Sequence, residues 1–252
     1  AFLAPLVVSW LRGFSWTYVF VASAAYCAAM LLPTIFVYRE PQRPASTKSL
    51  RDVLAGAADV LGDARFMLMV VVYSGFWILY FQNFGTVLWY LRDVVDKAPV
   101  SAAMTALLEG LGLHIAFRFD FEHVTVINAG TIVLLQVVVS RIVADRKALP
   151  TMIWGMLLGA VGFALLAAST SPWVFIAGIV VFSLGEMTAH PKYYSFIGLV
   201  APPDRKAVYM GYAFLYGVFG SLLGSNIGAF LYARMIEPVL HTAAVAGRAR
   251  VF

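Results

Sequence analysis

Long apolar runs separated by short polar connections dominate the chain. Six runs are long enough to cross a hydrocarbon core about 30 Å thick, given a helical rise of about 1.5 Å per residue. They cover approximately residues 16–38, 66–91, 123–141, 149–168, 173–200 and 207–232. The pattern therefore predicts an all-α, polytopic membrane protein with six transmembrane helices.

The two ends of the chain do not contain a further complete span. The first residues, AFLAPLVVSWLRG, are apolar but too short to cross a bilayer, and they lack the basic segment of a secretory signal peptide. We expect the chain to begin part-way through a spanning helix, as a fragment of a longer protein would. The tail 234–252 carries charged residues and is not expected to span.

Composition supports a membrane protein and excludes several other classes. The chain is 62% hydrophobic and only 12% charged, whereas soluble domains are about 25% charged. Its net charge of +5 does not indicate nucleic-acid binding, because the basic residues lie in short connections and not along one helix face. Cys27 is the only cysteine, so an intrachain disulfide is impossible.

The charges of the connections predict the orientation in the membrane. Basic residues are concentrated in 39–65, 141–147 and 202–206, whereas the turn 169–172 has no charge and 92–122 has mixed signs. Because basic connections of membrane proteins stay in the cytoplasm, we expect those three on the cytoplasmic side of a multi-pass cell-membrane protein.

The long basic connection has two parts. REPQRPAST, residues 39–47, is a linker in composition. The following KSLRDVLAGAADVLGDARF has apolar residues at helical spacing opposite its charges, which predicts an amphipathic helix. Such a helix would either lie on the membrane surface between two bundles or form a solvated linker.

Glu186 is the strongest candidate for a functional residue. It lies within the apolar run 173–200, roughly 20 Å from its start and therefore near the bilayer centre. A carboxylate there is costly, so it is expected to face a cavity or a partner and to bind substrate or carry a proton. The alternative is a salt bridge that only joins two helices.

Three further residues could act with Glu186. His190 follows it by four positions and so projects from the same helix face, where it could relay protons or bond a neighbouring helix. Gln82 lies at a similar depth in its own run, roughly 24 Å along the helix, so we predict a cavity shared with Glu186; an interhelical hydrogen bond is an equal alternative. Tyr193 is a weaker candidate for substrate contact.

The turn RIVADRKALP resembles a signature of the major facilitator superfamily. That signature, of the type G-x-x-x-D-R-x-G-R-R/K, follows the second and eighth helices of these transporters. Asp145, Arg146 and Lys147 match its centre, whereas its glycine positions are absent here. The resemblance implies a role in conformational gating, because an Asp beside Arg at a helix end can make a charge-assisted contact that holds one conformation. An ordinary charged turn is the alternative.

Within that superfamily, three stretches resemble the proton-dependent oligopeptide transporters. FWILYFQNFGTVLWYL is similar to their seventh helix, HVTVINAGTIVLLQ to the start of the eighth, and GEMTAHP with LVAPPDRKAVYMGYAFLYGVFGSLLG to the tenth and eleventh. The likeness adds Asn128 to the candidate substrate or coupling residues. The chain departs from this family at Phe81, where many members have an acid, and at Ala213, which takes the place of a Trp.

The resemblance implies a domain organisation and a function. Residues 1–38 would end an N-terminal bundle, 39–65 would be the cytoplasmic linker, 66–233 a C-terminal bundle lacking its last helix, and 234–252 a tail. We expect proton-coupled symport of di- or oligopeptides; the alternative is symport or export of another small polar solute. The partners would be that solute, protons, the lipid bilayer and the missing helices, with no cofactor and no nucleic acid.

A membrane-embedded enzyme is the alternative of a different class. By residue type, the loop before residue 124 offers four possible metal ligands: His114, Asp120, Glu122 and His123. Their spacing matches no zinc pattern, and the sequence shows neither a nucleophile with its base nor a phosphate-binding glycine loop. We therefore expect no metal site and no enzymatic activity.

Overall fold

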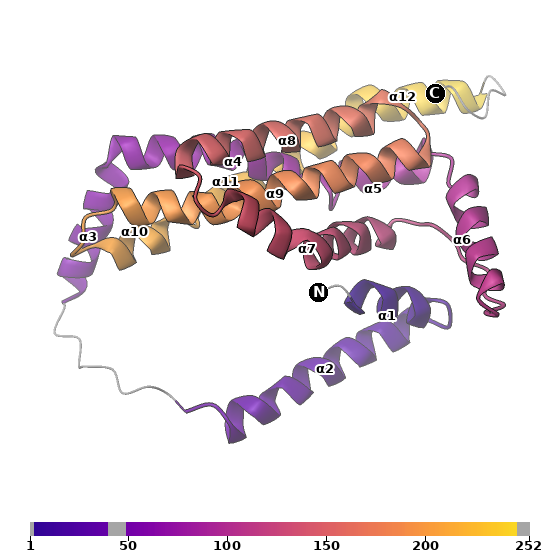
Figure 1. Ribbon diagram of the computed structural model, residues 1–252, viewed down its shortest axis with the longest axis horizontal. Helices are drawn as coiled ribbons and strands as arrows, with labels where there is room; N and C mark the ends of the chain where they lie inside the picture. The colour runs from indigo at the N-terminus through magenta and orange to yellow at the C-terminus, as the bar shows by residue number, and fades with distance from the viewer. Residues whose placement is uncertain (1–2, 40–48, 246–252) are drawn as a thin grey trace.

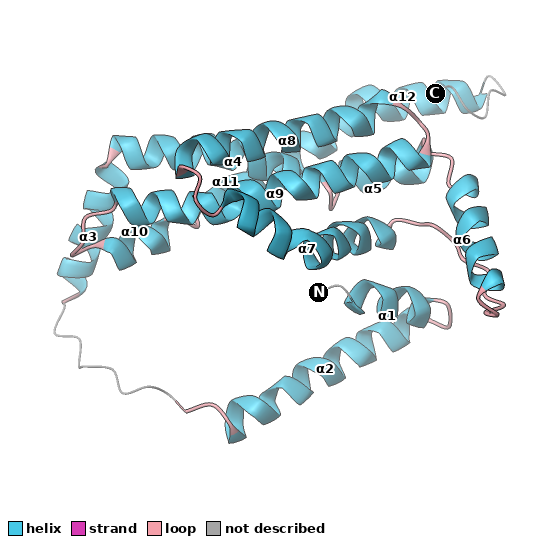
Figure 2. Cartoon of the chain, in the orientation of Figure 1, coloured by secondary structure: helices cyan, strands magenta, loops and turns pink. Residues whose placement is uncertain are grey.

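The computed structural model describes residues 3–39 and 49–245, and the regular structure in these ranges is helical (Figures 1 and 2). The helices are α1 (Leu3–Arg12), α2 (Trp16–Phe36), α3 (Leu50–Gly62), α4 (Ala64–Gln82), α5 (Thr86–Asp93), α6 (Ala98–Gly110), α7 (Glu122–Val143), α8 (Ala148–Ala168), α9 (Pro172–Val200), α10 (Lys206–Tyr212), α11 (Leu215–Leu231), the π-helix η1 (Tyr232–Ile236) and α12 (Glu237–Val245). The all-α prediction is confirmed.

Six helical stretches in the described residues are long and apolar enough to cross a membrane, as predicted. The sequence alone places the end of the last one too early. Beyond Tyr232 the chain does not leave the helix but continues through η1 into α12, so the candidate span reaches Thr242. Arg234 and Glu237 lie within this helical stretch, and Pro238 is the second residue of α12, a position near a helix start where proline is tolerated.

Two of the spans contain a break. α4 ends at Gln82, and α5 begins at Thr86 after a turn at Gly85, whose φ of −142° and ψ of −96° are not helical. α10 and α11 are separated at Ala213 and Phe214. Broken helices are tolerated at membrane depth only where protein or a cavity satisfies the freed backbone groups. At each break we therefore expect a neighbouring side chain or a cavity to satisfy the free backbone groups.

α8 and α9 form the closest helix pair, and small residues make this approach possible. A Cβ added to Gly162 on α8 would lie only 2.6 Å from the backbone nitrogen of Phe182 on α9. A Cβ added to Gly185 on α9 would lie 2.6 Å from the carbonyl oxygen of Gly155 on α8. Side chains at these positions would force the two backbones apart.

α11 packs on α4 in a similar way. Gly220 and Gly224 face Trp77 and Ile78, and Gly228 faces the side chain of Gln82. The glycines of α11 recur every three or four residues, and three of the four allow this close helix approach. Gly217, the fourth, does not contribute, because a Cβ there would meet no atom within 4 Å.

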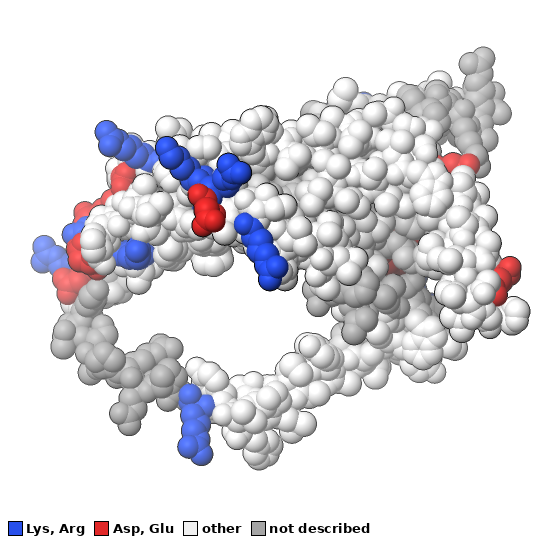
Figure 3. Space-filling model, viewed as in Figure 1, with Lys and Arg blue, Asp and Glu red and all other residues white. Residues whose placement is uncertain are grey.

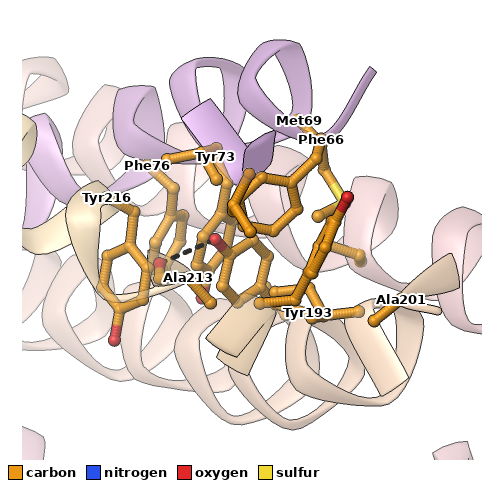
Figure 4. Packing of buried hydrophobic residues seen from close by; sticks show 14 of the residues in the cluster. Phe66, Met69, Tyr73, Phe76, Tyr193, Ala201, Ala213 and Tyr216 are labelled. Carbon is orange, nitrogen blue, oxygen red and sulfur yellow. Dashed lines mark hydrogen bonds between the residues drawn. The ribbon is translucent and has the colours of Figure 1, made fainter. Parts of the chain in front are cut away.

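An aromatic core joins α4, α9 and the α10–α11 break (Figure 4). The rings of Tyr73 on α4 and Tyr193 on α9 stack with centroids 4.0 Å apart. The Tyr193 hydroxyl donates a hydrogen bond of 2.8 Å to the carbonyl of Ala213, which lies at the break (Figure 4). This contact satisfies one of the backbone groups that the break leaves free.

The amphipathic helix predicted after the linker is α3, and it docks at one end of the bundle. Asp59 on α3 pairs with Arg205 at 2.5 Å, and Asp63 accepts a 2.9 Å hydrogen bond from Tyr209 on α10. Val60 is the only buried side chain of α3, and most of its apolar face is exposed, so a surface-lying and a solvated helix both remain open. Of the predicted linker REPQRPAST, only Arg39 lies within the described residues.

Charged side chains cluster at the end of the bundle formed by α3, α10 and the α7–α8 turn (Figure 3). The basic connections therefore share one end, as alternating spans require. That this end faces the cytoplasm stays a prediction.

Candidate substrate site around Glu186

Glu186 lies on the face of α9 that packs against α7. Asn128 of α7 donates from Nδ2 to Glu186 Oε2 at 3.1 Å and to Ser183 Oγ at 2.9 Å. The Ser183 hydroxyl in turn donates to the carbonyl of Ile179 in the preceding turn of α9. These bonds fix the orientation of the carboxylate without neutralising its charge.

No Lys, Arg or His lies within 4 Å of the Glu186 carboxylate among the residues that the structure describes. The alternative of a helix–helix salt bridge thus finds no partner there. A carboxylate at this depth needs either a proton or an external cation, because an isolated charge is costly in a low-dielectric interior.

Glu186 and Asn128 line a cavity of about 430 Å³ between α4, α7 and α9. Tyr80 and Phe84 contribute aromatic walls, and Asn83 contributes an amide. Asn83 is buried, and its Oδ1 has no hydrogen-bond partner. An unpaired buried acceptor is costly, so Asn83 is a polar residue kept in the cavity wall at an energetic cost.

Sequence reasoning did not single out Asn83 or Ser183. Asn83 follows Gln82 directly in an apolar run, so its polarity alone could have drawn attention to it. Ser183 is three residues before Glu186, the spacing that places two side chains on one helix face. Nothing in the sequence shows which of several such residues faces the cavity.

Gln82 does not line the Glu186 cavity, so the predicted shared cavity is wrong for this residue. Its Nε2 donates to the carbonyl of Gly224 on α11 at 2.6 Å, and its Oε1 accepts from Thr86 at 2.7 Å. Gln82 therefore joins α4, α5 and α11 across the break after α4. It lines a different, mainly apolar cavity of about 360 Å³.

His190 faces an aromatic group and not Glu186. Its Nδ1 lies 3.0 Å from the hydroxyl of Tyr73, and its ring meets Trp77 edge-on at 5.4 Å. No hydrogen bond between His190 and Glu186 is present in the described structure.

Tyr193 is fully buried in the aromatic core and uses its hydroxyl on Ala213. Its neighbour Tyr194 shares a 3.2 Å hydrogen bond with Tyr216. The structure thus gives Tyr193 a packing role, and any contact with substrate would require this core to open.

The turn of Asp145, Arg146 and Lys147 is exposed, and the side chain of a buried lysine is hydrogen-bonded to its backbone. Lys192 of α9 donates to the carbonyls of Ala144 at 2.9 Å and Arg146 at 2.8 Å. An ammonium at the C-terminal end of α7 satisfies carbonyls that the helix leaves unpaired and complements its dipole. Sequence reasoning did not single out Lys192.

The four possible metal ligands do not converge. In the described ranges, no three His, Cys, Asp or Glu side chains are placed to hold a metal ion. His123 instead bonds through Nδ1 to the backbone of Asp120. Glu122 and Asp120 lie near Arg12 of α1, so these carboxylates serve ion pairs and not a metal site.

The described helices form a polytopic membrane protein in which Glu186 lines a cavity between helices. The family model of the Major Facilitator Superfamily matches residues 1–225, and the chain belongs to this family of transporters. The chain therefore belongs to a family of multi-pass membrane transporters and not to a family of enzymes.

Several named proteins are similar to the chain. It is 26% identical to the multidrug resistance protein MdtH of Aeromonas salmonicida over 92% of the chain and 53% of that protein. It is 24% identical to the uncharacterised MFS-type transporter YttB of Bacillus subtilis over 86% of the chain and 50% of that protein. MdtH of Photorhabdus laumondii is 29% identical over 35% of the chain and 22% of that protein.

The chain thus spans about half the length of the first two relatives. The matches support the superfamily but not the oligopeptide transporters, so that narrower resemblance is unsupported.

Proposed function

We propose that the full-length protein is a secondary transporter that exports lipophilic organic cations in exchange for protons. The observation that carries the proposal is the Glu186 carboxylate, which is oriented by Asn128 in an aromatic-walled cavity with no cation of the described chain beside it. Such a site suits a cation with an apolar body, because rings and carboxylate act on the same ligand.

Exchange follows from competition for one carboxylate. A protonated Glu186 cannot form an ion pair with a cationic substrate, and a Glu186 that is paired with substrate does not bind a proton at the same time. Proton binding from one side and substrate binding from the other therefore displace each other as the two bundles rock about the site. The name of the MdtH relatives, multidrug resistance protein, agrees with export but describes those proteins.

The finer alternative from the sequence is proton-coupled peptide symport. A peptide brings a carboxylate as well as an ammonium, and its carboxylate needs a cationic partner. No Lys or Arg is among the residues that line the Glu186 cavity. The carboxylate of a bound peptide would therefore need a cationic partner from outside this cavity. The described lining of the cavity favours a substrate that carries only a positive charge.

Accumulation assays with full-length protein in cells distinguish the two functions. We expect expression to lower the steady-state accumulation of tetraphenylphosphonium, and dissipation of the proton gradient to abolish this effect. Uptake of radiolabelled dialanine should be unchanged. Proton-driven dialanine accumulation without tetraphenylphosphonium export would overturn the proposal in favour of peptide symport.

A further inference from the structure

The hairpin of α1 and α2 is attached to the rest of the protein near one residue, Arg12. α1 packs on α7, and the Arg12 guanidinium lies 2.6 Å from Oε1 of Glu122, the first residue of α7. A second carboxylate, that of Asp120, is 3.7 Å from Arg12. The guanidinium carbon also lies 4.8 Å from the centre of the Phe121 ring.

Glu122 is buried to an unusual degree for a carboxylate near a helix start. Its side chain is 6% exposed, and Oε2, the oxygen not facing Arg12, has no hydrogen-bond partner in the described residues. Arg12 is the one cation of the described chain within 4 Å of it. Removing one partner of a buried ion pair leaves an uncompensated charge, which is strongly unfavourable.

The rest of the hairpin diverges from the second bundle. In α2, Val19 is the only buried side chain, and all side chains from residue 23 to 36 are exposed. Figure 1 shows α2 running away from the bundle toward the linker, whereas α1 stays beside α7. The Arg12 contact is thus at the end of the molecule opposite to α3 and the basic turns.

We propose that the Arg12–Glu122 pair is a latch that closes the transporter at this end. While the pair is intact, the two bundles stay in contact there, and the Glu186 cavity is shielded from that side. When the bundles separate, both charges reach water and no longer need each other, so the same pair has two stable arrangements. Asp120, itself 3.4 Å from Lys97, offers Arg12 a second anion during the separation. This inference rests on the proposed function, since it assumes alternating access.

Cysteine accessibility tests the latch without any substrate. Thr125 lines the Glu186 cavity, so Thr125→Cys in a cysteine-free, full-length protein, with Cys27 replaced by Ser, reports whether the cavity is open. The probe is a membrane-impermeant maleimide applied to intact cells. We expect Arg12→Gln to raise the labelling rate about tenfold, within the range of allosteric couplings. Arg92→Gln is the matched control, because the Arg92–Asp93 pair lies within α5 and joins no two bundles.

Charge reversal separates a latch from a folding defect. Arg12→Glu combined with Glu122→Arg should return the labelling rate of Thr125→Cys close to its original value. In addition, Arg12→Cys with Glu122→Cys should crosslink under oxidation and lower the labelling, with recovery on reduction. Labelling of Arg12→Gln at the original rate, or a crosslink that leaves the labelling unchanged, would overturn the latch. A protein with a working latch but no tetraphenylphosphonium export would instead refute the proposed function alone.

Discussion

Asn128 on α7 donates one amide to both Glu186 and Ser183 on α9, at 3.1 and 2.9 Å. This amide is the only side chain of α7 that is hydrogen-bonded to α9 among the described residues. It therefore joins two helices and orients the carboxylate that the proposed function needs.

Asn128→Ala should weaken both the helix contact and the site. Interhelical hydrogen bonds in membrane proteins contribute about 0.6 kcal/mol on average and up to about 1.7 kcal/mol. We expect a lower melting temperature in detergent and a several-fold weaker binding of tetraphenylphosphonium. Gln136→Ala is the control, since Gln136 bonds only to Ser140 on its own helix and should change neither quantity.

Glycine packing predicts different effects for substitutions at Gly162, in the α8–α9 contact, and at Gly217, outside it. Gly162→Ala places a Cβ 2.6 Å from the nitrogen of Phe182 and 2.8 Å from the carbonyl of Gly178, so backbones must move. Overpacking of this kind costs about 1–3 kcal/mol. Gly217→Ala, on α11, meets open space and should be neutral or slightly stabilising, because Ala favours the helix. Equal melting temperatures for the two variants would contradict the observed packing.

Asp63 should make stability depend on pH at the linker end of the bundle. The pKa of its carboxyl lies below the usual value because the backbone N–H of Phe66 and the hydroxyl of Tyr209 donate to the ionised form. Its contribution is therefore complete above the unfolded pKa of about 3.9 and is lost as the pH falls through the lower folded pKa.

Asp63→Ala tests this effect. At pH 7 it should cost about 1 kcal/mol, as expected for loss of an N-cap, and the difference from the unaltered protein should shrink below pH 4. Melting temperatures between pH 3 and 7 measure it. Asp204→Ala, an exposed neighbour, should have little effect at any pH. A constant difference for Asp63→Ala across the whole range would show that ionisation is not the cause.

The number, type and order of the spans could be predicted because each is a long apolar run. The breaks after Gln82 and at Ala213 could not, since no proline marks them and packing by α11 and Tyr193 stabilises them. The continuation beyond Tyr232 was missed for a similar reason: its charges resemble those of a tail.

For the site residues, the sequence predicts the depth in the membrane but not the direction in which each side chain points. The rise per residue places Glu186 and Gln82 at comparable depths, yet the rotation of α4 aims Gln82 at α11 and away from Glu186. Helix packing likewise decides that His190 meets Tyr73 and that Lys192 reaches the turn after α7. Asn128 was predicted as a site residue only through the family resemblance. Its position in the sequence does not show that it contacts Glu186, because the folding of α7 against α9 brings the two together.

Export by the Glu186→Gln protein is the most direct test of the account. Gln keeps the size of the side chain and can still accept the bond from Asn128, but it can neither ionise nor release a proton. Tetraphenylphosphonium export by the full-length protein should fall at least about tenfold, a loss of about 1.4 kcal/mol or more, with unchanged amounts in the membrane. Glu109→Gln, on the exposed part of α6, should export normally. Near-normal export by Glu186→Gln, with the same dependence on pH as the unaltered protein, would contradict the account and leave Glu186 a structural residue.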